Sequence, residues 1–489
     1  MIQQLDSADV VRQQVTQQGD RARRASLGQF MTPLSVARFM ASLFPAEGPR
    51  HARLLDAGAG VGALSCAFLD RWERRELPFA SVEATAYELD PDLRTHLTEH
   101  LAAYQRATAR VIAGDFIFVA TELPGDPGGY THAILNPPYK KINTGSAHRA
   151  ALRHAGIETV NLYTAFVALG VDLLAPGGQL VAIIPRSFCN GPYYRPFREF
   201  VLRRAALHQI HLFHSREAAF SDDAVLQENV IIRLERGAKQ GRVRVSMSSD
   251  DTFANLESRS YPFSRIVHAD DPEGFIHIPT SAKRVQLERD PALCYTLADL
   301  DLSVSTGPVV DFRLRRHLRH EPTDGTVPLL YPAHFTGRQL EWPKPEGKKP
   351  SAIADNDETR RWLYPAGTYC VVRRFSSKEE RRRIVASIVD PASLGTAEAI
   401  GFENHLNVFH HGRRGLPEDL AHGLAAYLNT PAVDEAFRQF NGHTQVNATD
   451  LKQMRYPSSH VLVSLGRWAK GHVGYTDVMA AEQLAALTR

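Results

Sequence analysis

Several features that would narrow the class of protein are missing from this 489-residue sequence. Its four cysteines, Cys66, Cys189, Cys294 and Cys370, lie far apart and form no Cys-x-x-Cys pair, so neither a zinc ribbon nor a disulfide framework is indicated. No apolar run approaches the roughly 20 residues that cross a bilayer, and the polar first 28 residues lack the apolar core of a signal peptide. We therefore expect reduced thiols, a cytoplasmic location, no metal site and no membrane partner.

A strong charge of one sign is also missing. The chain has 57 Lys and Arg residues against 54 Asp and Glu residues, a formal net charge of +3. A surface that binds nucleic acid would therefore have to come from local clusters of basic residues. With 43% hydrophobic residues, the composition is that of a folded chain with two or three domains, and it excludes a disordered or collagen-like protein.

The first half of the chain has a regular pattern of short apolar segments that alternate with helical spacing, with helices expected over residues 8–24, 33–44 and 63–70. Such alternation predicts βαβ units and a mainly parallel sheet covered on both faces, that is, an α/β fold. Beyond about residue 265 the alternation fades, and Pro, Gly and charged residues become frequent. We therefore predict one domain over residues 1–265 and a second, mixed α and β with long loops, over 266–489. The strands expected in the first are Arg53–Asp56, Ala84–Glu88, Arg110–Ala113, His132–Leu135, Leu180–Pro185 and Val230–Leu234.

A glycine-rich turn follows the first expected strand, where Asp56 is followed by Gly58 and Gly60. Glycines let the backbone turn tightly and approach a ligand, although a turn of this kind is often only structural. In a dinucleotide site, an acidic residue stands ~20 residues after the strand that precedes the glycine turn. Here the next such acid is Glu88, 32 residues after Asp56 (88 − 56).

The third strand ends in Asp115-Phe116, which suits an adenine ring: the carboxylate accepts from the amino group and the aromatic ring packs on the face. Glu88 at the second strand end suits a ribose diol. Each acid alone is more simply a solvated strand end. Together, Asp56, Glu88 and Asp115 favour a nucleoside without a pyrophosphate and indicate S-adenosylmethionine as the cofactor.

The fourth strand runs into the tetrapeptide Asn136-Pro137-Pro138-Tyr139. The two prolines stiffen the loop and remove two backbone donors, so that it presents bare carbonyls. The Asn136 side-chain oxygen and the Pro137 carbonyl then offer two acceptors, and Tyr139 a flat ring. Two acceptors suit an amine on an aromatic ring, because they free its lone pair and stabilise the positive charge that develops on methylation. The simpler alternative is a Pro-Pro turn that ends a strand.

With these motifs the chain resembles the γ class of DNA adenine-N6 methyltransferases, the TaqI-like enzymes, and within it the PstI/BsuBI branch. The following segments carry the resemblance: Gly28–Pro33, Asp56–Gly62, Glu88, Asp115-Phe116, Asn136–Tyr139, Asn161–Tyr163, Gly177–Pro185, Gln439–Asn447 and Leu451–Pro457. It implies a Rossmann-like, S-adenosylmethionine-dependent domain followed by a DNA-recognition domain, and an adenine flipped out of the duplex.

The resemblance also implies roles for single residues. Phe30, Thr32 and Pro33 would join the cofactor site, as would Phe116 and Asn136. Tyr139 would stack on the flipped adenine, with Phe220 as the second aromatic neighbour; a core position is the alternative for Phe220.

Two basic clusters in the second half are candidates for DNA contacts, because Arg and Lys hold phosphates and Arg reads guanine edges. A charge run is more often a solvated face. The leading hypothesis is the modification enzyme of a type II restriction-modification system, with double-stranded DNA as substrate and a cognate endonuclease as a possible partner. A protein-glutamine or RNA amine methyltransferase is the alternative, but the roughly 220 residues after the catalytic half argue for DNA recognition. The DNA-contact candidates are Arg313, Arg315, Arg316, Arg373, Arg374 and Lys378.

Overall fold

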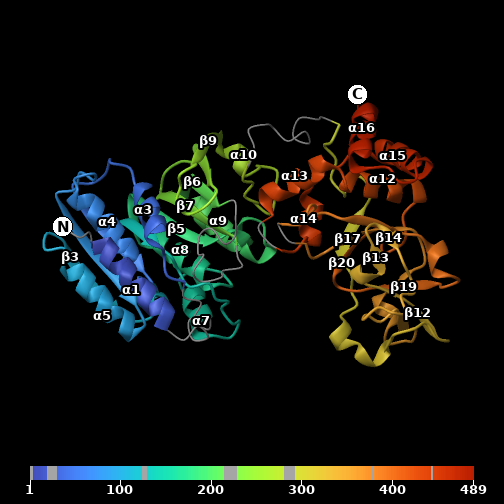
Figure 1. Cartoon of the computed structure of the whole chain (residues 1–489), viewed down its shortest axis with the longest axis horizontal. Helices are drawn as coiled ribbons and strands as arrows, with labels where there is room; N and C mark the ends of the chain where they lie inside the picture. Colours follow the sequence, from blue (N-terminus) through green and yellow to red (C-terminus); the bar gives the residue numbers. More distant parts are fainter. Residues whose placement is uncertain are drawn as a thin grey trace. The chain divides into compact units, whose positions relative to one another are not determined.

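A computed structural model describes residues 4–18, 30–123, 129–213, 228–279, 292–376, 379–441 and 444–488 (Figure 1). The chain divides into two compact units, Met1–Thr280 and Ser281–Arg489. Each unit has its own sheets and core, and each is described separately below.

The first unit is built on a nine-stranded sheet in the order β3-β2-β1-β4-β5-β7-β6-β8-β9. The five strands from β3 to β5 are parallel, whereas β7 runs antiparallel between β5 and β6. All the carboxyl ends of the parallel strands therefore meet at one edge. The strands are β1 (His51–Ala57), β2 (Ser81–Glu88), β3 (Thr108–Ala113), β4 (Tyr130–Leu135), β5 (Leu174–Pro185), β6 (Ala205–Phe213), β7 (Asn229–Arg236), β8 (Arg242–Ser248) and β9 (Glu257–Pro262).

Helices cover both faces of this sheet (Figure 1). One core cluster joins the sheet to α1 (Gln4–Gln18), α3 (Leu34–Ser42), α4 (Ala63–Glu73) and α5 (Pro91–Ala102). The other joins it to α6 (Phe116–Glu122), α7 (Ala147–His154), α8 (Leu162–Leu173) and α9 (Arg195–Arg204), and α10 (Phe263–Ile266) follows β9. Successive strand residues alternate between the clusters, as Leu54 and Leu55 do, so the strands are buried on both sides. The predicted α/β fold with a mainly parallel sheet is confirmed.

Several features of this unit differ from the sequence-based expectation. The helix expected over residues 8–24 begins earlier, since α1 is Gln4–Gln18; residues 19–24 lie outside the described residues. Strand β6 is not expected from the sequence, because His208, Gln209 and His211 interrupt its apolar pattern. His211 is nevertheless fully buried, since its ring nitrogens lie 3.0 Å from the Ser246 hydroxyl and 3.2 Å from the Ser248 hydroxyl.

The first compact unit extends to Thr280, whereas the sequence analysis ends its first domain at residue 265. Residues 266–279 pack on the first unit: the amide of Ile276 donates to the Cys189 carbonyl (2.9 Å), and Ile276 and Ile278 belong to the first core. The segment around Phe275–Ile278 therefore belongs with the sheet before it.

The second unit is mixed α and β. A four-stranded antiparallel sheet has the order β10-β20-β17-β18, and a five-stranded sheet the order β11-β15-β12-β19-β16. Its strands are β10 (Ser303–Thr306), β11 (Leu318–Arg319), β12 (Thr326–Leu330), β13 (Phe335–Thr336), β14 (Gln339–Leu340), β15 (Ala352–Ala354), β16 (Leu363–Pro365), β17 (Tyr369–Arg373), β18 (Ala386–Val389), β19 (Ala399–Phe402) and β20 (Leu406–His410).

Five helices follow the sheets of the second unit: α12 (Glu418–Leu428), α13 (Pro431–Phe440), α14 (Ala448–Gln453), α15 (Ser459–Gly471) and α16 (Asp477–Leu487). Helices α12 and α15 cross at Gly423 and Gly466, where a Cβ on either glycine would collide with the backbone of the other helix. Among the described residues, no helix is long and apolar enough to span a membrane.

Candidate cofactor and catalytic site

The turn after β1 has a backbone that only glycine adopts without strain at two positions. Gly58 and Gly60 have φ angles of +74° and +58°. The amides of Gly58 and Ala59 both donate to the carbonyl of Tyr87 at the end of β2 (2.9 and 3.0 Å). These bonds tie the glycine turn to the neighbouring strand end.

Glu88, the last residue of β2, also holds this turn. Its Oε2 accepts from the Gly60 amide and its Oε1 from the Asp90 amide, both at 2.8 Å. The side chain is buried, and this burial raises the pKa of the carboxyl above its ordinary value, against the effect of the two amide donors.

Asp56, at the end of β1, lies behind the turn rather than in the cavity. Its Oδ2 accepts from the amide (3.1 Å) and the hydroxyl (2.6 Å) of Ser65, in the first turn of α4. Its buried Oδ1 has no hydrogen-bond partner among the described residues. Complete burial raises the pKa of Asp56 to about 7. The structure therefore places Asp56 where it positions the helix that follows the glycine turn.

The third strand end carries Asp115, which begins α6 by accepting from the Ile117 amide (2.9 Å). Its other oxygen, Oδ2, lies 2.7 Å from Nε2 of His148 on α7. The Phe116 ring lies 5.1 Å from the ring of Tyr87 and 5.0 Å from the ring of Phe166. An acceptor and an aromatic surface therefore adjoin at this strand end.

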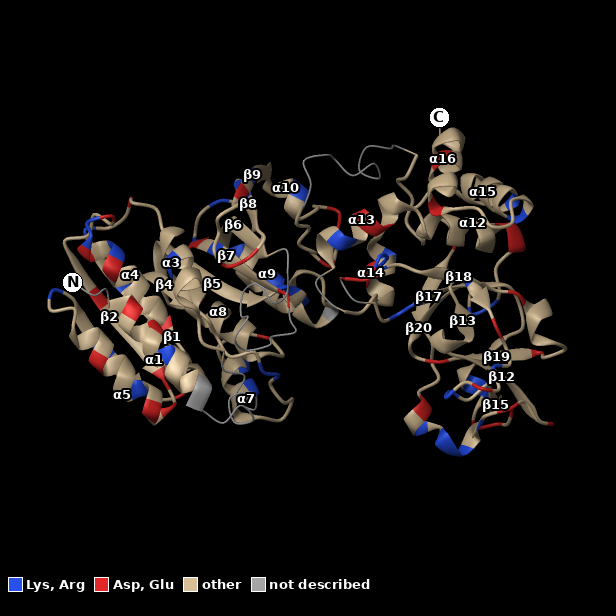
Figure 2. Cartoon of the chain, in the orientation of Figure 1, with Lys and Arg blue, Asp and Glu red and all other residues tan. Residues whose placement is uncertain are grey.

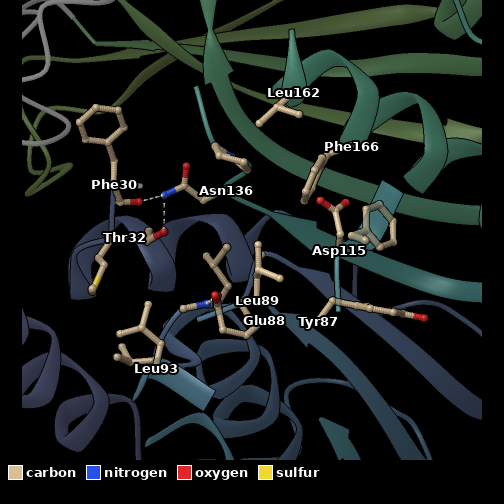
Figure 3. A pocket seen from close by; sticks show the side chains of 18 of the residues that line it. Phe30, Thr32, Tyr87, Glu88, Leu89, Leu93, Asp115, Asn136, Leu162 and Phe166 are labelled. Carbon is tan, nitrogen blue, oxygen red and sulfur yellow. Dashed lines mark hydrogen bonds between the residues drawn. The ribbon is translucent and has the colours of Figure 1, made fainter. Parts of the chain in front are cut away.

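The tetrapeptide after β4 is tied to the segment that precedes α3. The Asn136 side-chain nitrogen donates to the Phe30 carbonyl (2.6 Å) and to the Thr32 hydroxyl (2.9 Å), as Figure 3 shows. A carbonyl can only accept, so these contacts fix which end of the amide is nitrogen. The amide is thus held with its oxygen directed away from Phe30 and Thr32.

The hydroxyl of Tyr139 lies 3.2 Å from this Asn136 oxygen and 3.3 Å from the Ile183 carbonyl. Its ring is 5.4 Å from the Phe30 ring, at 40°. Burial raises the pKa of the Tyr139 hydroxyl, which therefore stays protonated as a donor. The second aromatic candidate, Phe220, lies outside the described residues.

Apart from Asp56 and Tyr139, these groups line a cavity of about 240 Å³ at the carboxyl edge of the sheet. In Figure 3 the side chains of Asp115 and Phe166 stand on one side of it, and those of Phe30, Thr32 and Leu93 on the other. Of the residues proposed from the sequence, the lining includes Phe30, Thr32, Gly58, Gly60, Glu88, Asp115, Phe116, Asn136 and Pro138. Pro33 is not in the lining; it precedes α3 as its N-cap residue.

The sequence analysis missed several lining residues. They include Leu89, Leu93, Lys140, His148, Leu162 and Phe166. Leu162 and Phe166 stand four residues apart on α8, so they share one helix face, and that spacing could have indicated them. Nothing in the sequence marks His148. Within the described residues, no group of three His, Cys, Asp or Glu side chains is placed to hold a metal ion.

The basic candidates lie in the second unit, where Lys and Arg alternate with Asp and Glu (Figure 2). Arg313, Arg315 and Arg316 are exposed around two short 3-10 turns, and Arg316 forms an ion pair with Glu358. Beside them Phe312 is 61% exposed.

The second basic cluster is more constrained. Arg373 forms an ion pair with Glu380, and Arg374 donates to the Asn404 carbonyl (3.1 Å) and the Gln445 side chain (3.2 Å). Lys378 lies outside the described residues.

Comparisons with known proteins find relatives among restriction-modification enzymes. Residues 74–220 match the Eco57I restriction-modification methylase family. The chain is 51% identical over 456 residues to the Type II methyltransferase M.BsuBI of Bacillus subtilis, covering 91% of this chain and 90% of that one. It is 41% identical over 469 residues to the Type II methyltransferase M.PstI of Providencia stuartii, covering 93% and 91%. The fold also resembles the Type IIL restriction-modification enzyme MmeI in complex with DNA, with a TM-score of 0.51 at 10% identity over 99% of this chain and 73% of that one.

Proposed function

The chain belongs to the family of Type II DNA methyltransferases that includes M.BsuBI and M.PstI, and from this premise we propose its reaction. It transfers the methyl group of S-adenosylmethionine to N6 of an adenine flipped out of double-stranded DNA, as the modification enzyme of a restriction-modification system in the cytoplasm. The observation that carries the proposal is the fixed amide of Asn136, whose nitrogen is bound by Phe30 and Thr32.

The cavity residues fit S-adenosylmethionine. Gly60 leaves open space for a ligand, since no atom lies within 4 Å of the place where its Cβ would be. Both Glu88 oxygens hold one amide each and keep lone pairs for a ribose diol. Asp115 offers an acceptor to the adenine amino group, and Phe116 and Phe166 offer apolar walls for the ring. When bound, the cofactor supplies an electrophilic methyl group.

Asn136 prepares the adenine nitrogen for methylation. Its oxygen has two lone pairs; Tyr139 uses one, and the second accepts from one amino hydrogen of the substrate. The Pro137 carbonyl accepts from the other hydrogen. These two acceptors draw the amino nitrogen toward tetrahedral geometry and stabilise the charge it carries as it gains the methyl group. The proton is lost afterwards to solvent, so the mechanism needs no strong base.

Pro138 forms part of the cavity wall, so the loop brings the substrate nitrogen next to the cofactor. Tyr139 and Phe220 are the aromatic residues we assign to stacking on the flipped base. The second unit, from Ser281 on, is proposed to recognise DNA. Its exposed Arg313, Arg315 and Arg316 would hold phosphates, and Arg373, Arg374 and Lys378 complete the proposed set.

Double-stranded DNA is therefore the proposed partner, with a cognate endonuclease as a second one. A protein-glutamine or RNA amine methyltransferase is not favoured, because M.BsuBI and M.PstI match nine-tenths of the chain at 51% and 41% identity.

Methyl transfer from tritiated S-adenosylmethionine to three substrates tests the proposal: unmethylated duplex DNA, total RNA and a peptide-release factor. We expect incorporation into DNA alone, abolished by Asn136→Ala. Incorporation into RNA or the release factor but not DNA would overturn the proposal.

A further inference from the structure

One side chain of the cavity, His148, is not accounted for by the proposed mechanism. It lines the cavity from α7, and its Nε2 lies 2.7 Å from the Asp115 Oδ2. Its ring stacks on the ring of Phe118, with centroids 4.8 Å apart and planes at 24°. The stacking and the bond to Asp115 together fix both the position and the rotation of the imidazole.

The helix that carries His148 is itself well anchored. Ser146 caps it by accepting from the Arg149 amide (3.3 Å), and Leu152 is buried in the core of the first unit. The Glu158 carboxylate pairs with both Arg149 and Arg153. His148 therefore projects from a rigid element, as a residue that orients another must.

The chemistry of Asp115 depends on what donates to it. Oδ1 accepts from the Ile117 amide and Oδ2 from the His148 N–H. An ionised carboxylate only accepts hydrogen bonds; the two donors fix its orientation, and each oxygen keeps a further lone pair. Such a group pairs well with a 6-amino purine, whose amino group donates. It pairs poorly with a 6-oxo purine, which presents an oxygen at the same place.

We propose that His148 makes the cofactor subsite selective for a 6-amino purine, by holding the Asp115 carboxylate in the cavity as a hydrogen-bond acceptor. His148 is in this sense a positioning residue that acts through Asp115. The inference rests on the proposed function, because it takes the cavity as the site of the cofactor's adenosyl group. Without the imidazole, only the Ile117 amide among the described residues holds the carboxylate, so its Oδ2 can rotate away from the purine and the preference for a 6-amino group falls.

Binding of two ligands to the full chain tests this role. S-adenosylhomocysteine carries the 6-amino purine, and S-inosylhomocysteine is the same molecule with a 6-oxo group. By calorimetry, the unaltered protein should prefer the former on the order of 10- to 100-fold, because the latter leaves an acceptor facing an acceptor. His148→Ala should reduce this preference at least several-fold.

Three further variants separate the role of the donor from that of the ring. His148→Gln places an amide N–H near the position of Nε2 and should retain most of the preference. His148→Phe keeps a ring against Phe118 but has no donor, so it should behave as His148→Ala does even if the alanine variant folds poorly. His154→Ala is the matched control, an exposed histidine on the same helix, and should leave the preference unchanged.

An unchanged preference in both His148→Ala and His148→Phe would overturn the proposed role of His148 and leave the proposed function standing. Tighter binding of S-adenosylhomocysteine by these variants would also overturn it, because the imidazole would then be an obstacle to the purine. If the unaltered protein binds neither ligand, the proposed function fails instead.

Discussion

Thr32 provides the sharpest test of how the catalytic amide is oriented. Its hydroxyl accepts one N–H of the Asn136 amide at 2.9 Å, and the Phe30 carbonyl accepts the other at 2.6 Å. Thr32→Val removes this acceptor with little change of shape, at a position that is only 5% exposed. The amide then turns more easily, and its nitrogen can face the substrate amine in place of its oxygen.

The size of the effect follows from the single hydrogen bond that the substitution removes. A hydrogen bond of this kind contributes about 0.5–1.5 kcal/mol, which corresponds to a fall in kcat of about 2- to 12-fold. Because Thr32 also lines the cavity, the affinity for the cofactor has to be measured separately.

Single-turnover methylation of duplex DNA, at saturating S-adenosylmethionine, is the appropriate assay. Thr32→Ser is the matched control, since it keeps the hydroxyl and should retain nearly the full rate. A Thr32→Val enzyme with the unaltered rate, or one impaired only in cofactor affinity, would refute the argument that Thr32 orients Asn136.

Three other perturbations have defined outcomes. Asp56 has a pKa raised by burial to about 7 from 3.8, so its contribution to stability is present at low pH and is lost as pH rises through about 7. Urea unfolding should therefore show the free energy of unfolding falling between pH 3.8 and about 7, by at most about 1.4 kcal/mol per pH unit, and a flatter profile for Asp56→Asn; equal slopes would contradict the burial argument. Gly60→Ala should lower the free energy of unfolding by about 1 kcal/mol, because its Cβ meets no atom and only the positive φ is strained; no change in urea midpoint would argue against this. The last perturbation replaces the exposed Arg313, Arg315 and Arg316 with alanine. The slope of log binding constant against log salt concentration should become shallower by about one unit for each phosphate that is no longer neutralised. An unchanged slope would show that these arginines do not contact DNA.

The architecture of the first unit can be predicted from the sequence because its signals are local. Apolar segments of strand length alternate with helical spacing, and acids stand at successive strand ends. Each of the six expected strands overlaps a strand of the structure. Strand β6 escapes prediction because the buried His211 is polar in the sequence, and only its contacts with Ser246 and Ser248 on β8 make its burial favourable. Those partners lie 35 and 37 residues away, beyond any periodicity.

In the cavity, too, local sequence signals predict some residues and miss others. Gly58, Gly60, Glu88 and Asp115 could be named because parallel strands bring their carboxyl ends to one edge. The direction of the Asp56 side chain could not be predicted, because a strand-end carboxylate can point into the cavity or back to the helix that follows. In the structure it bonds to that helix.

The contact of His148 with Asp115 joins residues 33 apart in the sequence, and the contact of Asn136 with Thr32 joins residues 104 apart. No local pattern encodes such tertiary contacts. In the second unit, charge alone marked the arginines. The pairing of Arg373 with Glu380 and the contact of Arg374 with Gln445 depend on how three separate segments meet.

The central claim is tested most directly by the identity of the methylated atom. Duplex DNA treated with the protein and S-adenosylmethionine is digested to nucleosides, and these are separated and weighed by mass spectrometry beside authentic standards. The account predicts N6-methyladenine as the product, and none with Asn136→Ala. Methylcytosine as the product, or N6-methyladenine at the unaltered level from Asn136→Ala, would contradict it.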